Sequence, residues 1–189
     1  MSKNKIPEFL RHAKQLKKNA IRYAAVESVI FFKESFVNEG WTDGALTKWK
    51  KSNTPLAGKR TLYKSGKLMQ SIRKLEATDQ RLVVIADSDH AEIHNEGGYI
   101  TVTEQMKRYF WAQHLKFKKR NKKKAEFCKF MALKKVGSKV KIDKRQFIGE
   151  SRTLMQNLDS WFRGSVNSNF DKTKQEYPFI LTSDGKSAY

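Results

Sequence analysis

A long run of apolar residues at helical spacing, near the start of the chain, restricts the possible folds more than any other feature. Between Glu8 and about Asn38 the apolar positions recur every three or four residues. They are Phe9, Leu10, Ala13, Leu16, Ala20, Ile21, Ala24, Ala25, Ile30, Phe31 and Phe36. This periodicity predicts one long amphipathic helix, with Pro7 in a first turn that tolerates proline. Gly40 predicts its end, because glycine readily adopts the left-handed conformation that terminates helices.

The segment after this helix contains turn-forming residues, followed by a second helical pattern. Residues 41–60 include several Gly, Ser, Thr and Asn, which favours an ordered loop over a regular element. Trp41 and Trp49 are large apolar anchors that would hold such a loop on the core. The apolar positions from Leu62 to Leu75 then predict a short helix that begins near Ser65, whose hydroxyl would serve as the N-cap.

Short β-branched runs follow, and they determine the expected fold class. Residues 81–87, RLVVIAD, predict a strand, and residues 74–78 could supply an antiparallel partner. Residues 90–96 could form a helical turn that ends at Gly97 and Gly98, after which residues 99–103 alternate like a strand that returns to the sheet. We therefore expect an α+β fold, in which the long N-terminal helix and further helices pack on a small, mainly antiparallel sheet.

The second half of the chain is again mainly helical in pattern. Apolar spacing predicts helices between residues 104 and 136, a short strand at 140–142 and a final helix from Gly149 to Phe162. The residues after Gly164 are mostly polar. This pattern predicts a single α+β domain over residues 1–164, with a basic helical insertion at about 104–141, and a polar C-terminal tail over residues 165–189.

Positive charge is concentrated in that insertion. The chain has a net charge of +20, and residues 107–141 contain fourteen Lys or Arg and one acid, Glu126. Such a concentration attracts an anionic partner, which could be nucleic acid, a membrane surface or an acidic protein. Seven cations in nine residues repel one another, which predicts a solvated hairpin tip or a mobile loop at residues 116–124. The candidate contacts to nucleic acid or an acidic partner are Lys116, Lys118, Lys119, Arg120, Lys122, Lys123 and Lys124.

Aromatic residues are interleaved with these cations and leave two interpretations open. Phe110, Trp111, Phe117 and Phe127 could stack on bases while the cations contact phosphates. Their helical spacing instead favours positions in the core, with the cations on a solvated face or a protein interface. No apolar run approaches the ~20 residues that span a bilayer, and no signal-peptide pattern follows Met1, so we expect a soluble chain without membrane contact.

Catalytic and metal-binding motifs are incomplete in this sequence. His90 and His94 lie four residues apart, but a zincin needs glutamate directly after the first histidine, and a zinc deaminase needs more than one cysteine. The single cysteine, Cys128, could act as a nucleophile with His114 as base, but its apolar surroundings favour an inert thiol. An acidic cluster without the glycine of a calcium loop favours a solvated turn or an interface patch. Its members are Asp87, Asp89, Glu92 and Glu96. We expect no enzymatic activity, no metal and no cofactor.

Three segments, in order along the chain, resemble the motifs of one known family. LYKSGKLMQSI at residues 62–72 is similar to L-x-x-[ST]-G-x-L-x-x-S-I, and VVIADSDHAEIHNEGG at 83–98 is similar to a strand followed by Y-A-x-I-H-x-x-G-G. IDKRQFIGES at 142–151 is similar to I-P-x-R-x-F-[IL]-G. On these segments the chain resembles the phage virion morphogenesis (tail-completion) proteins of Mu-like phages and prophages. It departs from them at His90, where the family has tyrosine, at Asp143, where it has proline, and in its lysine-rich insertion.

The resemblance implies a structural role in a virion. It implies an α+β protein that completes the tail or joins it to the head, as a homo-oligomeric ring in contact with other phage head, neck or tail proteins. Its location would be the virion and, during assembly, the host bacterial cytoplasm. The structural or interface positions implied are Arg60, Ser65, Gly66, His94, Glu96, Gly97, Gly98, Arg145 and Phe147, none of them catalytic. The charge supports an alternative, a basic nucleic-acid-binding protein that uses the lysine-rich insertion.

Overall fold

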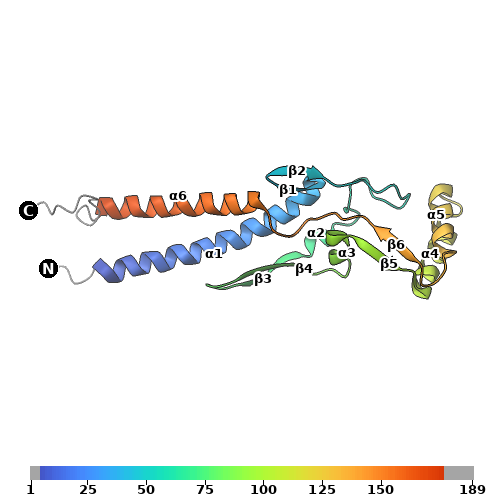
Figure 1. Cartoon of the computed structure of the whole chain (residues 1–189), viewed down its shortest axis with the longest axis horizontal. Helices are drawn as coiled ribbons and strands as arrows, with labels where there is room; N and C mark the ends of the chain where they lie inside the picture. Colours follow the sequence, from blue (N-terminus) through green and yellow to red (C-terminus); the bar gives the residue numbers. More distant parts are fainter. Residues whose placement is uncertain (1–4, 177–189) are drawn as a thin grey trace, which may run out of the picture. The chain divides into compact units, whose positions relative to one another are not determined.

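The computed structural model describes the backbone of residues 5–176 and the side chains of residues 10–169, and it has the expected α+β fold (Figure 1). The elements in order are α1 (Lys5–Asn38), β1 (Gly40–Asp43), β2 (Ala45–Lys48), α2 (Lys67–Gln70), β3 (Ile72–Ala77), β4 (Leu82–Ala86), α3 (Ala91–Glu96), β5 (Gly98–Thr101), α4 (Glu104–Phe117), α5 (Lys122–Ala132), β6 (Lys139–Ile142) and α6 (Arg152–Glu176). The chain divides into two compact units. Unit 1 contains the residues up to Ile30, Lys74–Val84 and the residues from Ser151 on, and unit 2 contains Phe31–Arg73 and Ile85–Glu150.

The first helix follows the predicted apolar pattern, but its end differs from the prediction. α1 stops at Asn38, and Glu39, with φ 47°, has the left-handed conformation expected of Gly40. Gly40 is instead the first residue of β1, where a Cβ would lie 2.6 Å from the carbonyl oxygen of Thr47. The glycine is needed for the close approach of two strands, so the prediction that it ends the helix is wrong by one residue.

Two basic side chains cap the C-terminus of α1. The Nη2 of Arg60 donates to the carbonyl oxygens of Phe36 at 2.7 Å and Val37 at 3.2 Å. The Nζ of Lys48 donates to the carbonyl oxygen of Asn38 at 2.6 Å. The last four carbonyls of a helix lack partners within the helix, and cations at this end also interact favourably with the helix dipole. Arg60 therefore has a structural role as a C-terminal cap.

The predicted loop over residues 41–60 begins with a β-hairpin. β1 and β2 pair antiparallel, with Trp41 opposite Thr47, and Gly44 turns the chain with φ 75°. The loop prediction is therefore wrong for residues 41–48. Strands of four residues are too short to show a clear alternation of apolar and polar positions. The available signal was the dipeptide of Asp43 and Gly44, since Asp-Gly commonly marks hairpin turns.

Aromatic side chains form the core of unit 2. Phe36 and Phe147 are fully buried, and their ring centroids lie 5.0 Å apart. The ring of Trp49 meets Phe36 edge to face at 5.5 Å, and its Nε1 donates to the carbonyl oxygen of Gln146 at 2.8 Å. Buried tryptophans usually find such a partner for their one polar atom. Phe147 thus joins the segment after β6 to the end of α1.

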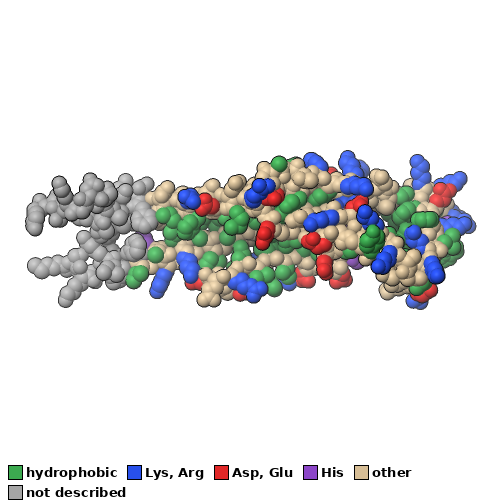
Figure 2. All heavy atoms as spheres, viewed as in Figure 1, with side chains coloured by type: hydrophobic (Ala, Val, Ile, Leu, Met, Phe, Trp, Pro, Cys, Tyr) green, Lys and Arg blue, Asp and Glu red, His purple; other side chains and the backbone are tan. Residues whose placement is uncertain are grey.

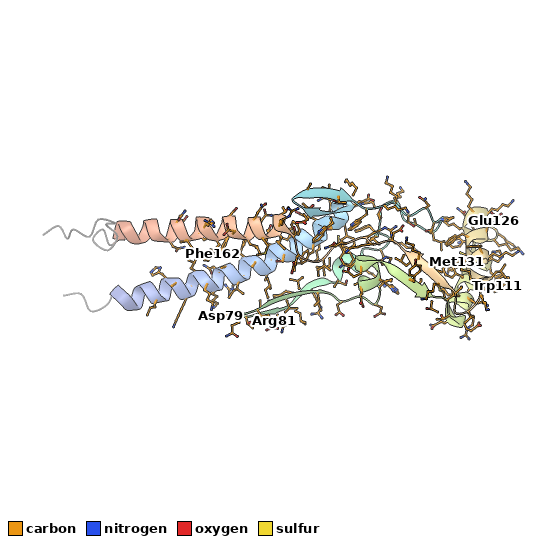
Figure 3. All side chains as sticks on the ribbon, in the orientation of Figure 1. Asp79, Arg81, Trp111, Glu126, Met131 and Phe162 are labelled. Carbon is orange, nitrogen blue, oxygen red and sulfur yellow. The ribbon has the colours of Figure 1, made fainter. Side chains whose placement is uncertain are left out.

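Unit 1 is built on contacts between α1, α6 and the turn that joins β3 to β4. Tyr23 of α1 stacks on Trp161 of α6, with ring centroids 4.3 Å apart. The Nζ of Lys17 lies 3.3 Å from Oδ2 of Asp79, which is labelled at the β3–β4 turn in Figure 3. Both partners of this ion pair are largely exposed, so it adds little to stability.

The last helix is longer than predicted. α6 continues past Phe162 and through Gly164 to Glu176, so the first part of the predicted polar tail is helical. Nothing lies within 4 Å of a Cβ built at Gly164, and a glycine inside an exposed helix costs only about 1 kcal/mol relative to alanine. One glycine is therefore too weak a signal to end a helix. The remainder of the predicted tail, residues 177–189, lies outside the described residues.

The strands of the described chain form three separate antiparallel pairs, where the sequence suggested one small sheet. β3 and β4 form the pair expected from residues 74–78 and 81–87, but β3 begins at Ile72, so the helix predicted up to Leu75 is wrong after Gln70. β5 pairs with β6, with Tyr99 opposite Lys141, so residues 99–103 do not return to the β3–β4 sheet. The chain leaves β5, forms α4 and α5, and comes back through β6, which makes the basic insertion a helical hairpin carried by two paired strands (Figure 1).

Both helices of this α4–α5 hairpin begin at a side-chain cap. The Oγ1 of Thr103 accepts a hydrogen bond from the Met106 amide at 3.1 Å, and the Oδ1 of Asn121 accepts one from the Lys124 amide at 3.0 Å. The asparagine cap allows α5 to start inside the cationic run. Residues 118–121 connect the two helices and are exposed, so the segment is the predicted hairpin tip, but it is shorter than the predicted range of 116–124.

Candidate functional site

Most residues of the three segments that resemble the phage family lie in unit 2, where hydrogen bonds connect them. The Asp87 amide donates to the carbonyl oxygen of Ser71 at 3.0 Å, which joins the first segment to the second. The Arg145 amide donates to the carbonyl oxygen of His94 at 2.8 Å, which joins the third to the second. We name this packed region the motif centre, and it consists of residues 60–72, 85–98 and 142–150.

Asn95 holds the motif centre together, and it was not among the predicted positions. Its Oδ1 accepts hydrogen bonds from the amides of Phe147 at 2.9 Å and Ile148 at 3.0 Å, and the residue is 8% exposed. Its Nδ2 donates to Oε1 of Glu96 at 2.6 Å, while Oε2 of Glu96 lies 3.4 Å from the Nζ of Lys144. The predicted position Glu96 thus orients Asn95. Asparagine near a glycine is common at helix ends, so this long-range role could not be predicted from the local pattern.

The predicted glycines of the motif centre have backbone conformations that other residues resist. Gly97 has φ 72° and ψ −172°, and a Cβ there would lie 2.7 Å from the amide nitrogen of Lys144. Gly98 has φ 133°. Gly66, with φ 76°, is the N-cap residue of α2, so the prediction that Ser65 caps this helix is wrong by one residue. Ser65 is an exposed residue that lines a neighbouring cavity.

That cavity has a volume of about 560 Å³ and lies in unit 2 beside the motif centre. Two arginines and two histidines line it, Arg60, Arg145, His90 and His94, together with four lysines. None of its lining residues, all of which the structure describes, is Asp or Glu. The cavity therefore has a strongly positive wall without a compensating acid in it. We refer to it as the cationic cavity.

His94 and Arg145 are the most enclosed of these cationic residues. The Nδ1 of His94 is buried and has no hydrogen-bond partner. Burial, and then the charges of Arg145 and His90, lower the pKa of His94. Arg145 is 7% exposed, its Nε donates to the carbonyl oxygen of Lys50 at 3.0 Å, and its Nη2 lies 3.9 Å from Oδ2 of Asp143. These contacts fix the guanidinium at the cavity wall.

The candidate metal ligands are dispersed among the described residues, and the candidate nucleophile is buried. Within the described residues no three of His, Cys, Asp and Glu lie close enough to hold a metal ion. Cys128 is fully buried, and burial raises the pKa of its thiol, which disfavours the nucleophilic thiolate. The Nδ1 of His114 lies 2.9 Å from the carbonyl oxygen of Ala125, so that nitrogen has a backbone partner.

The α4–α5 hairpin presents cations and aromatic rings on its surface. Figure 2 shows Lys and Arg side chains around the hairpin with hydrophobic surface among them. Tyr109, Trp111 and Phe130 are 53%, 44% and 59% exposed, and Trp111 is labelled in Figure 3. The Nζ of Lys134 lies 4.6 Å from the centroid of the Phe130 ring. Other aromatics behave as the helical spacing suggested, since Phe110 packs edge to face on Phe127 at 6.3 Å between the two helices.

The predicted lysine-rich contacts differ in exposure. Lys116, Lys118, Lys119, Arg120, Lys122 and Lys123 are exposed. Lys124 is half-buried, and its Nζ lies 5.6 Å from the centroid of the Phe117 ring. This side chain therefore contributes to packing within the hairpin, and the exposed six form the surface that a partner would meet.

Comparisons with known proteins found no match. No family model, no curated protein and no solved structure matches this chain. None of the helices within residues 5–176 is long and apolar enough to cross a membrane.

Proposed function

We propose that this chain is a structural phage or prophage protein that completes the tail or the head–tail joint, as a ring of identical subunits in contact with other virion proteins. The observation that carries the proposal is the motif centre. Of three segments that resemble one family, the second and third are joined by the hydrogen bonds of the buried Asn95, and the first meets the second at the end of the β3–β4 hairpin. The third segment lies more than forty residues beyond the second, so its contacts with the second do not follow from nearness in the sequence.

The roles of the matched residues also suit an assembly protein. Arg60 caps a helix, Gly97 admits a close backbone contact and Phe147 fills the core. These roles are structural, and they give each subunit a fixed shape that neighbouring subunits can contact.

Exposed apolar side chains offer surfaces for such neighbours. In unit 1 the exposed large hydrophobic residues include Val26, Ile30, Met155 and Phe162, the last of which is labelled on α6 in Figure 3. In unit 2 they include Val37, Tyr99 and Leu133. Apolar residues exposed in a free subunit are commonly covered when subunits associate. This supply of apolar surface supports self-association or capture by another virion protein.

Deletion of the gene from the phage or prophage that encodes the chain tests this proposal. We expect the deletion to abolish infectious particles and to leave separate heads and unfinished tails, visible by electron microscopy. Expression of the wild-type chain from a plasmid should restore joined particles, and Asn95→Ala should not. Asn157→Ala is the matched control, because its exposed amide makes only a 3.4 Å contact to Glu27. Normal particles from the deletion strain would overturn the proposal.

A second candidate function is supported by the exposed rings of the α4–α5 hairpin. Rings among cations provide stacking platforms for bases beside contacts for phosphates, as in proteins that bind single strands. Trp111→Ala should weaken binding to a single-stranded oligonucleotide by about 1–3 kcal/mol. Tyr99→Ala is the matched control, since Tyr99 is exposed on β5 and outside the hairpin. Equal affinity of both variants and the wild type would rule out stacking on Trp111.

A further inference from the structure

The cationic cavity has the size and the walls of a small-molecule site. Its volume of about 560 Å³ falls within the roughly 300–1,000 Å³ typical of ligand pockets. Leu56, Leu62 and Tyr63 supply apolar wall, while hydroxyl groups such as those of Thr61 and Ser88 supply polar wall. Apolar walls with a few polar groups are the usual composition of a site for a small organic molecule.

The segment that forms one side of the cavity is held in a fixed conformation. The amide of Thr61 donates to Oε2 of Glu39 at 2.9 Å, and Arg60 forms an isolated β-bridge with Tyr63. Between them Leu62 has φ 56°, a left-handed conformation that a bulky side chain adopts only when its surroundings enforce it. The carboxylate of Glu39 is thus used by the segment itself and is not part of the cavity lining.

The charged groups that face the cavity are all basic. They come from the 51–67 segment, from α3 and the turn before it, and from Arg145 after β6. Asp143 lies 3.9 Å from Nη2 of Arg145 and offsets part of its charge, but it does not line the cavity. The buried Nδ1 of His94 has no partner at all.

We propose that the cationic cavity binds the phosphate group of a small phosphorylated molecule, with His94, Arg145 and Arg60 around the anion and the apolar wall against its organic part. A phosphate accepts several charge-assisted hydrogen bonds at once, which suits a cavity lined by two guanidinium groups, imidazoles and lysines. The cavity is large for a bare phosphate, so an esterified one fits better. This inference goes beyond the proposed assembly role and does not depend on it.

Histidine titration by NMR gives the first test. The four histidines His12, His90, His94 and His114 are followed with inorganic phosphate, adenosine monophosphate or adenosine, at constant ionic strength set with chloride. An anion beside His94 should stabilise its protonated form and raise its pKa by about one pH unit, whereas His12 on α1 and His114 in the hairpin should not change. We expect this rise with adenosine monophosphate and, at higher concentration, with phosphate, but not with adenosine. Equal responses of His94 and His12 would contradict the site.

Calorimetry on variants of the full chain gives the second test. His94→Leu removes the imidazole and should raise the Kd for adenosine monophosphate about tenfold or more. Lys64→Gln with Lys67→Gln, both exposed at the cavity, should raise it by a few fold. Lys139→Gln with Lys141→Gln is the matched control, because it removes the same charge from exposed positions on β6.

The outcomes separate site binding from general charge attraction. Weaker binding in the cavity variants alone supports the proposal. Equal weakening by the cavity pair and the β6 pair would show attraction to the basic surface only, and would overturn it, as would the absence of binding to the wild type. If His94→Leu fails to fold, the Kd values of the cavity lysine pair and the β6 lysine pair still test the proposal. Particle yield tests the assembly role separately, so failure of one proposal is distinguishable from failure of the other.

Discussion

The motif centre and the α4–α5 hairpin both belong to unit 2, but their polar groups are used in different ways. In the motif centre, Arg145 and Asn95 are buried, and each is tied to backbone groups from another segment. In the hairpin the exposed cations include Lys123 on α5, and both helices begin at their own side-chain caps.

This difference shows that charge count is a poor guide to structural importance. A buried polar group that satisfies backbone amides cannot be removed without leaving those amides unpaired, which is expensive in a low-dielectric interior. An exposed lysine is solvated in both the folded and the unfolded state, so its removal changes stability little. Single changes in the motif centre should therefore affect folding more than several changes together in the hairpin.

The largest effect is expected from Asn95→Ala. This change leaves the amides of Phe147 and Ile148 without their acceptor and opens a small cavity beside the core. We expect the free energy of unfolding to fall by about 3 kcal/mol, measured by urea denaturation. Asn157→Ala, the exposed control on α6, should cost less than about 0.5 kcal/mol. Equal small losses of unfolding free energy in both variants would show that Asn95 stabilises the fold no more than the exposed control residue does.

The next effect is expected from Gly97→Ala, compared with Gly137→Ala. Both glycines have positive φ, 72° and 85°, but only at Gly97 would a Cβ collide with a backbone atom, the Lys144 nitrogen at 2.7 Å. A Cβ at Gly137 meets nothing within 4 Å. Gly97→Ala should cost about 2–3 kcal/mol and Gly137→Ala about 1 kcal/mol, from thermal or urea unfolding. A reversed order would show that the contact with Lys144 relaxes freely.

A smaller effect is expected from pH, and it sharpens the comparison because it arises in the motif centre alone. Burial, Arg145 and His90 hold the pKa of His94 below its ordinary 6.5. As the pH falls below about 6.5, the unfolded chain takes up a proton that the folded chain resists, so stability should decrease. His94→Leu should flatten this part of the curve of unfolding free energy against pH, and His12→Gln should not. An unchanged slope in His94→Leu would exclude His94 as its source.

A second loss is expected at lower pH. The hydrogen bond from Thr61 lowers the pKa of Glu39 below its ordinary 4.5, so the stability that this carboxylate provides should be lost as the pH falls through that lower value. Glu39→Gln should remove this second phase and leave the phase that belongs to His94.

The smallest effect on stability is expected from neutralising the hairpin. Lys118, Lys119, Arg120, Lys122 and Lys123, all exposed, would be replaced by Gln. Lys124 is kept, because it packs over Phe117. The melting temperature should change little, since self-repulsion is relieved, while infectious yield and the salt dependence of DNA binding should both fall. A large drop in melting temperature would show that the hairpin charges are part of the fold, and full complementation would show that their charge is not used.

The parts of the fold that the sequence predicted well are those with long or strong local patterns. The apolar period of α1 and the β-branched run at residues 81–87 led directly to elements in the structure. The β1–β2 hairpin was not predicted because its strands are only four residues long. The end of α6 was placed too early because one exposed glycine destabilises a helix only slightly.

The candidate site could be predicted only in part, and that part came from the family resemblance and not from local patterns. The resemblance pointed to Arg145 and His94, which the structure brings to one cavity wall, but not to Asn95. The importance of Asn95 lies in a contact with residues more than fifty positions away, and nothing in its neighbours along the chain encodes that contact. Long-range polar contacts of this kind follow from packing and not from local pattern.

The most direct test of the assembly role is rescue in vitro. Heads and tails from a lysate of the deletion phage would be mixed with the purified wild-type chain, with Asn95→Ala or with buffer, and infectious titre would be counted. The account predicts that the wild-type chain restores infectious particles in proportion to its concentration until every joint is filled, and that Asn95→Ala restores far fewer. No rise in titre with the folded wild-type chain would contradict it.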